Sequence, residues 1–137
     1  MGRYNESLLK LRQAVRPYLS NSSGVVLIGV SGGADSMALA AATLAESSGK
    51  RLIPVVVDHG LQKNSAEIAS QVINRLSKMG FAEVFSVRAS VDMKDGLEAS
   101  ARRARYKVFD QAIETYGAEL FCLPTQKMIK LKVFYLD

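Results

Sequence analysis

The part of the chain best equipped for chemistry is a short string rich in glycine and serine that follows a hydrophobic run. Its residues are Ser31, Gly32, Gly33, Ala34, Asp35 and Ser36. Glycines carry no Cβ atom, so an anion can approach the backbone N–H groups, and the N-terminal end of a following helix favours negative charge. The serine hydroxyls add further hydrogen-bond donors. We therefore predict a loop that binds the phosphates of a nucleotide.

Asp35 adds a second function to this loop, because a carboxylate is repelled by a phosphate unless a cation lies between them. Mg²⁺ is commonly held by one or two carboxylates together with substrate phosphates. We therefore assign Asp35 as a Mg²⁺ ligand and a catalytic residue. The standard phosphate motifs do not fit, because the string lacks both the lysine of G-x-x-x-x-G-K-[ST] and the spaced glycines of G-x-G-x-x-G. A strand-to-helix turn with Ser or Asp as N-cap is the structural alternative.

Hydrophobic periodicity predicts strands and helices that alternate around this loop. We expect helices over residues 6–19, 37–46, 64–79 and 97–116, and strands over residues 25–30, 52–57, 83–87 and 120–123. Alternation at this spacing requires crossover connections, so we predict an α/β fold, a Rossmann-like parallel sheet with helices on both faces. Ligands bind at the carboxyl ends of such strands, where both the loop and Asp58 fall.

The helix expected after Asn64 shows the clearest amphipathic pattern. Asn64 and Glu67 have the spacing of a capping box at its start. The apolar face that the pattern predicts consists of Ala66, Ala69, Val72, Ile73 and Leu76. This face should pack on the sheet.

Composition limits the class of protein. A chain of 137 residues that is 48% hydrophobic fits one domain, which we expect to span residues 1–137. No apolar run approaches the ~20 residues of a membrane span, and we expect a cytoplasmic protein without a membrane partner. The lone Cys122 excludes an internal disulfide and is assigned no chemistry. A net charge of +5 suits a polyanionic partner, although excess cations often only solvate a surface.

The S-G-G-x-D-S pattern resembles the PP-loop of the N-type ATP pyrophosphatases, which split ATP into AMP and pyrophosphate. Two further segments narrow the resemblance to the tRNA(Ile)-lysidine synthetases. They are V-D-H-G-L at residues 57–61 and E-A-S-A-R-R-A-R-Y at residues 98–106. The similarity in order and spacing runs over residues 24–122. It implies the adenine nucleotide alpha hydrolase-like fold, incomplete here at its C-terminal end.

The resemblance implies an ATP-dependent reaction on the wobble cytidine of an isoleucine tRNA, in which the C2 oxygen is adenylated and the amine of L-lysine then displaces AMP. Its cofactors and substrates would be ATP, Mg²⁺, L-lysine and tRNA(Ile). The loop would hold the pyrophosphate. Val57 and Asp58 would lie beside the nucleotide, and His59, the only histidine, would contact either substrate as a catalytic residue.

The long helix carries arginines for which two interpretations stay open. Arg105 is assigned to the nucleotide site, and with Arg102 and Arg103 it either meets ATP or RNA phosphates or forms a solvated helix face. Family members commonly have Arg after H-G-L, whereas Gln62 stands here, so no charged contact is expected from that position.

Two other functions remain as alternatives. The first is another PP-loop enzyme that modifies tRNA, such as a thiolation enzyme. Those enzymes commonly need catalytic cysteines, and the single Cys122 argues against this class. The second is a non-catalytic module that binds ATP or RNA.

Residues 124–137 depart from the family, because the signature H-T-x-D-D-Q-A-E-T expected after the fourth strand is absent. In a shifted reading frame, each new codon consists of the third base of one codon and the first two bases of the next. The codons that can encode this tail then permit the sequence H-T-[KE]-[ND]-D-Q-A-E-S-V-L. The step from Met128 to Ile129 forces Asp, and the step from Phe134 to Tyr135 forces Leu. We therefore hypothesise a frameshift near the codon of Leu123 and expect an out-of-frame tail on a truncated, inactive enzyme. An unusual natural C-terminus is the alternative.

Loss of the later elements has structural consequences in this hypothesis. The remaining strands would leave an open sheet edge, and apolar surface would be exposed. The hydrophobic run at residues 133–136 would add an aggregation hazard.

Overall fold

The elements of the fold alternate as the periodicity predicts. The computed structural model describes residues 2–20, 24–47, 49–58, 60, 63–89, 96–118, 120–124 and 131–135. The elements are α1 (Gly2–Ser20), β1 (Val26–Val30), α2 (Ala34–Ala45), β2 (Leu52–Asp58), α3 (Ser65–Met79), β3 (Phe85–Arg88), α4 (Leu97–Tyr116), β4 (Leu120–Pro124) and β5 (Leu131–Tyr135).

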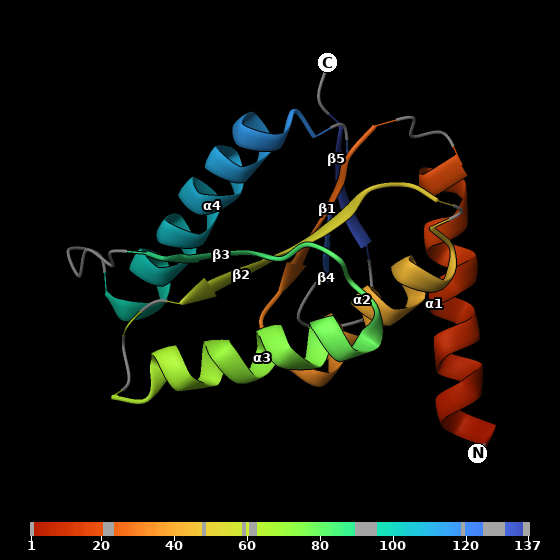
Figure 1. The fold of residues 1–137 in the computed structure, drawn as a ribbon, viewed down its shortest axis with the longest axis horizontal. Coiled ribbons are helices and arrows are strands. Elements are labelled where there is room, and N and C mark those ends of the chain that lie inside the picture. Colours follow the sequence, from red (N-terminus) through yellow and green to blue (C-terminus); the bar gives the residue numbers. More distant parts are fainter. Residues whose placement is uncertain are drawn as a thin grey trace.

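One sheet organises the molecule, with the strand order β3-β2-β1-β4-β5 (Figure 1). The strands β3, β2, β1 and β4 are parallel, and β5 pairs antiparallel with β4. The chain first moves outward from β1 to β2 and β3, then crosses through α4 to the other side of β1. The strand order therefore reverses between β1 and β4, and such a reversal is where open α/β sheets bind ligands.

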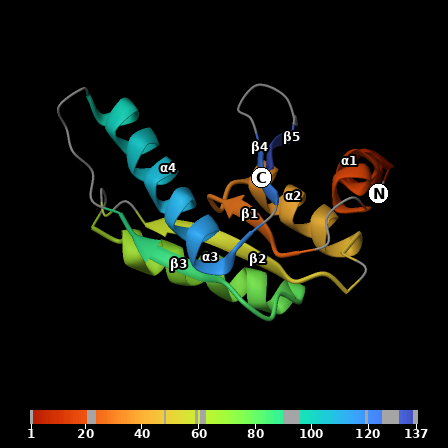
Figure 2. The same ribbon diagram turned by 90° about the horizontal axis from the view of Figure 1, so that it is seen from above.

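Helices cover both faces of the sheet, as predicted. One core cluster joins α1, α2 and α3 to the sheet and includes Val15, Ile28, Leu39 and Leu76, each fully buried. The second cluster lies under α4 and includes Leu27 and Ile53. Adjacent residues of β1 thus point to opposite faces, which explains its continuous hydrophobic run. Figure 2 shows α4 on one side of the twisted sheet and the other helices across from it.

Several expectations are corrected by the structure. A fifth strand that we did not predict, β5, pairs antiparallel with β4, so residues 133–135 of the tail lie in the sheet and β5 becomes its edge strand. Asn64 is the N-cap residue of α3 but makes no side-chain capping bond. Ala66, which we predicted on the apolar face of α3, is exposed, whereas Ala69, Val72, Ile73 and Leu76 pack in the core as predicted. No described helix is long and apolar enough to cross a membrane.

The first two helices are tied together by Glu46, just past the end of α2. Its carboxylate accepts hydrogen bonds from the Nε atoms of Arg12 and Arg16 of α1, at 2.9 and 3.0 Å. The hydrogen bonds from Arg16 and Arg12 lower the pKa of Glu46 from 4.5 to about 2. Helix α1 is thereby held beside α2, the helix that follows the predicted phosphate loop.

Glu46→Gln should destabilise the protein in a pH-dependent way. A lowered pKa in the folded state stabilises the protein above the unfolded-state pKa of about 4.3 and loses that contribution as the pH falls. The loss is complete once the pH has passed through the folded-state pKa of about 2. Urea denaturation should therefore give a lower midpoint for Glu46→Gln than for the parent at pH 7, with the two converging toward pH 2.

Glu114→Gln is the matched control, because Glu114 is an exposed residue of α4. Its denaturation midpoint should equal that of the parent at every pH. A difference between Glu46→Gln and the parent that persists unchanged into acid would contradict the ion-pair assignment.

Candidate functional site

The predicted phosphate loop joins β1 to α2, next to the point where the strand order reverses. Helix α2 begins at Ala34, three residues earlier than the predicted start at residue 37, so Asp35 and Ser36 belong to its first turn. The N-cap residue is Gly33, and no side chain caps the helix. The alternative of a turn built around a Ser or Asp N-cap is therefore wrong. The first N–H groups of the helix have no acceptor within it and are directed toward the loop.

The loop is held in shape by the hydroxyl of Ser36, which is 2% exposed. This hydroxyl accepts the N–H of Ser31 at 3.1 Å and donates to the carbonyl of Gly33 at 3.1 Å. The Ser31 hydroxyl lies 3.1 Å from it and accepts the N–H of Gly33 at 3.3 Å. Both serines predicted to face phosphate thus also close the loop on itself, and Ser31 is the one that is exposed.

Gly32 is required by the fold. Its φ of +92° lies in the left-handed region that side chains disfavour. A Cβ atom there would lie 2.7 Å from Cγ2 of Val72, a buried residue of α3. The absence of a side chain at Gly32 therefore lets α3 pack directly against the loop.

Gly33 differs, because the fold gives it no comparable reason to be glycine. Its φ is −71°, which any residue adopts. A Cβ atom there would meet only the Ser31 hydroxyl, at an ordinary 3.5 Å. Gly33 is exposed, so the space that a side chain would fill is open to a ligand.

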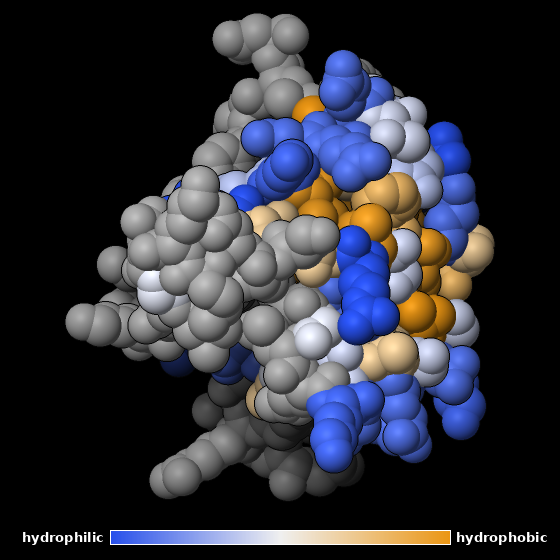
Figure 3. All heavy atoms as spheres, turned by 90° about the vertical axis from the view of Figure 1, so that its left-hand side faces the viewer, coloured by the Kyte–Doolittle hydropathy of each residue, from blue (hydrophilic) through white to orange (hydrophobic). Residues whose placement is uncertain are grey.

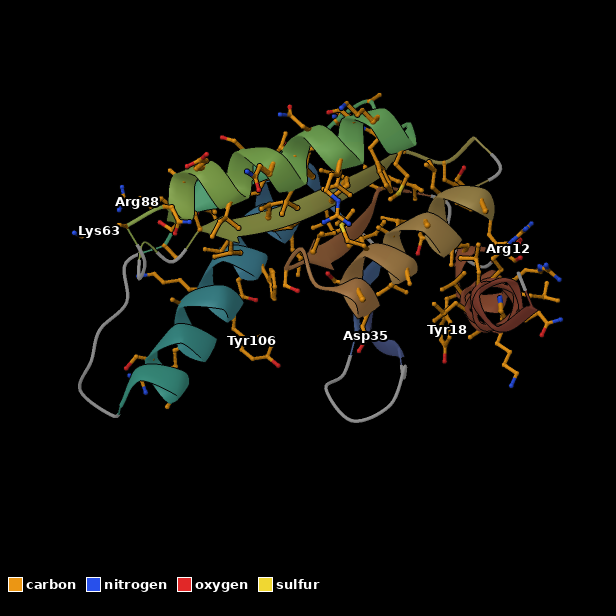
Figure 4. All side chains as sticks on the ribbon, turned by 90° about the horizontal axis from the view of Figure 1, so that it is seen from below. Arg12, Tyr18, Asp35, Lys63, Arg88 and Tyr106 are labelled. Carbon is orange, nitrogen blue, oxygen red and sulfur yellow. The ribbon has the colours of Figure 1, made fainter. Side chains whose placement is uncertain are left out.

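Asp35 is exposed on the first turn of α2, and Figure 4 shows its side chain directed away from the protein. Among the residues that the structure describes, no group of His, Cys, Asp and Glu side chains could hold a metal ion by itself. A lone exposed carboxylate beside a phosphate loop fits Mg²⁺, because this ion keeps several waters and takes its other ligands from substrate phosphates.

The D-H-G turn lies at the carboxyl end of β2. Val57 is half-buried against the α4 side of the sheet, and Asp58 is the last residue of the strand. The Asp58 carboxylate accepts the N–H of Gly60 at 2.8 Å, and its carbonyl accepts the N–H of Ala89 at 2.8 Å. Asp58 therefore fixes the turn and ties it to the end of β3.

Two of the predicted site residues cannot be placed against the loop. His59 lies outside the described residues, and Arg105 belongs to α4 but its side chain is outside the description. The predicted sites at the ends of β1 and β2 do share the carboxyl edge of the sheet, because these strands pair in parallel from Val26 and Leu52 onward.

Sequence reasoning missed Arg88. We expected the third strand over residues 83–87, whereas β3 runs from Phe85 to Arg88, so its last residue is a cation at the same edge. Arg88 pairs in register with Asp58. The signal was the alternation of apolar Phe85 and Val87 with polar Ser86 and Arg88, which is typical of an outer strand that extends one residue further.

A glycine-rich loop between the first strand of a parallel sheet and its helix, beside a reversal of strand order, defines a nucleotide-binding α/β domain. The chain belongs to the PP-loop domain family, which matches residues 4–128. The resemblance that the sequence motifs indicated is therefore confirmed at the level of the family.

Curated relatives are tRNA(Ile)-lysidine synthases. The protein of Leifsonia xyli is 43% identical over 105 residues, which cover 75% of this chain and 32% of the relative. The protein of Corynebacterium glutamicum is 43% identical over 109 residues, covering 80% and 33%. This chain thus spans about a third of the length of these relatives.

Solved structures share the fold at lower sequence identity. The U34-tRNA thiolase NcsA of Methanococcus maripaludis is similar with a TM-score of 0.70 and 17% identity, covering 86% of this chain and 46% of that one. The NH3-dependent NAD synthetase of Campylobacter jejuni is similar with a TM-score of 0.58 and 17% identity, covering 88% and 56%. The Rossmann-like fold class is confirmed.

Gly32→Ala should destabilise the protein more than Gly49→Ala. Both glycines have positive φ, +92° and +80°, but a Cβ atom at Gly49 would meet nothing within 4 Å. The clash with Val72 should therefore add about 1–3 kcal/mol to the backbone strain that both variants share. Chemical denaturation measures the two free energies of unfolding.

A double variant tests the contact itself. Val72→Ala removes the methyl group that a Cβ at position 32 would strike, so Gly32→Ala with Val72→Ala should cost less than the sum of the two single variants. Strict additivity would show that Val72 is not what excludes a side chain from position 32.

Proposed function

We propose that this chain carries the ATP-binding part of a tRNA(Ile)-lysidine synthase. In the whole reaction the C2 oxygen of the wobble cytidine attacks the α-phosphorus of ATP, and pyrophosphate leaves. The amine of L-lysine then attacks C2, loses a proton, and displaces AMP. The identity of about 43% to synthases of this name supports the proposal.

Gly33 is the single observation that carries the ATP-binding part of the proposal. Nothing in the fold requires a glycine at this exposed, ordinary backbone position, whereas an anion seated on the first N–H groups of α2 does require the space. Ser31 would donate its hydroxyl to the phosphates, and the backbone N–H groups of Gly32 and Ala34 would contribute to the same site. Ser36 would act by holding the loop in shape.

Mg²⁺ enters the proposal through Asp35, whose exposed carboxylate would hold the ion against the phosphate oxygens. When bound, Mg²⁺ would neutralise the charge that develops on the leaving pyrophosphate. The loop itself would supply fixed N–H dipoles, which need no reorganisation during the reaction. Val57 and Asp58 would border the nucleotide, and Arg105 and His59 would contact the substrates.

The substrates beyond ATP follow from the same family relationship. L-lysine and tRNA(Ile) would meet the nucleotide at the carboxyl edge of the sheet, where holding three reactants in line supplies much of the rate enhancement. The chain itself spans about a third of the length of these relatives, and we propose that it binds ATP.

We also propose that residues 1–137 form one PP-loop domain of which residues 124–137 are an out-of-frame tail. The shifted reading of the tail supports this division, because it contains the forced Asp of the missing signature.

Asp35→Ala and Gly33→Ala should both weaken binding of ATP with Mg²⁺ while leaving the thermal midpoint of unfolding unchanged. Removing the Asp35 carboxylate should cost on the order of 2 kcal/mol of binding free energy, which raises the Kd for ATP with Mg²⁺ more than tenfold. Isothermal titration of the 137-residue chain with ATP, with and without Mg²⁺, measures this loss.

Asp110→Ala is the control for these variants, because Asp110 is an exposed carboxylate on α4. It should bind ATP like the parent. Binding of ATP that stays dependent on Mg²⁺ in Asp35→Ala would contradict the metal assignment, and unchanged binding by Gly33→Ala would contradict the loop assignment.

Sequencing the coding DNA across codons 120–137 tests the tail. In the shifted frame the codons should encode the missing signature. The junction of the Gln126 and Lys127 codons should then encode glutamate or lysine. Codons whose shifted reading breaks the signature would overturn the frameshift and favour a natural C-terminus.

A further inference from the structure

The turn after β2 and the end of β3 are joined by a contact that the ATP loop does not use. The guanidinium group of Arg88 lies next to Gly60. A Cβ atom at Gly60 would lie 2.8 Å from Nη2 and 2.9 Å from Nε of Arg88. Gly60 has a φ of +66°, and its N–H is held by the Asp58 carboxylate at 2.8 Å. The turn is therefore shaped so that this cation can rest on it.

Arg88 is an exposed cation that forms no ion pair with a described carboxylate. The ion pairs among the described residues join Arg12 and Arg16 to Glu46, and Arg51 to Glu83. Neither Arg88 nor Lys63, three residues after Gly60, takes part in one. Glu67 lies four residues after Lys63 but is not paired with it. Within the part of the chain that the structure describes, two cations without an ion pair thus flank the turn.

These cations occupy a different part of the carboxyl edge from the phosphate loop. The strand order places β3 two strands away from β1, about 10 Å across the sheet. In Figure 4, Lys63 and Arg88 both lie at one end of the molecule, with Asp35 well apart from them. Figure 3 shows the surface of this end, where hydrophilic residues surround and partly cover hydrophobic ones.

We propose that Arg88, seated on Gly60, and Lys63 form a binding site for the phosphate backbone of RNA. This inference rests on the proposed function, in which an RNA must approach the carboxyl edge. Arginine suits the task because its planar fork binds phosphate through two donors and stays charged. An extended polyanion can reach this outer strand while its target base approaches the ATP loop. Gly60 is then a positioning residue, because any side chain there would displace the Arg88 guanidinium.

The test is the salt dependence of binding between the 137-residue chain and an unmodified isoleucine tRNA transcript. Each phosphate contact that is lost should reduce the slope of log K against log salt by roughly 0.7–0.9. Arg88→Gln and Lys63→Gln should therefore each weaken binding severalfold and flatten the slope. Arg75→Gln is the matched control, because Arg75 is an exposed arginine farther along α3, and it should change neither quantity.

Gly60→Ala tests the contact between Gly60 and the Arg88 guanidinium. It should weaken binding as Arg88→Gln does, and the double variant should be no weaker than Arg88→Gln alone. If Gly60→Ala fails to fold by circular dichroism, Arg88→Lys replaces it: the slope should be retained and the affinity should fall, because the charge remains and the fork is lost.

The outcomes separate this inference from the proposed function. ATP titration of Arg88→Gln and Lys63→Gln should give the parent Kd, since both residues lie away from the loop (Figure 4). If Arg88→Gln weakens ATP binding and leaves RNA binding unchanged, the cation serves the nucleotide and the inference is wrong. Equal slopes for Arg88→Gln and Arg75→Gln, or no RNA binding by the parent, would also overturn it, while ATP binding through Asp35 would still support the proposed function.

Discussion

The candidate site depends on one buried hydroxyl. Ser36 lies under the phosphate loop, holds the backbone of Ser31 and Gly33 in place, and is itself fixed on the first turn of α2. Packing of Val72 against Gly32 closes the same loop from the side of α3. The loop therefore has its shape before any anion arrives, so little ordering entropy has to be lost on binding.

The same constraint connects the loop to the rest of the molecule. Helix α3 can reach Gly32 only because β1 and β2 pair in register and place both crossover helices on one face. Helix α4 packs on the other face. A substitution in the core beneath Val72 would thus change the shape of the loop, although the substituted residue contacts no phosphate.

The fold class and the loop were predictable because they rest on local signals. Buried strands give continuous β-branched runs, and S-G-G-x-D-S follows one of them directly. The early start of α2 was missed because Ala34, Asp35 and Ser36 read equally well as loop or first helical turn. Arg88 and the pairing of β5 were missed because they depend on contacts between segments far apart in the chain, which periodicity does not report.

Strand β5 has a consequence for fragment complementation. It occupies the outer edge of β4, so a strand supplied by a separately translated polypeptide would first have to peel β5 away. Strand exchange of this kind is slow when a paired strand must leave before the newcomer gains any hydrogen bonds. The opposite edge of the described sheet is β3, and a strand added there would lie beside Arg88 instead of completing the nucleotide crevice.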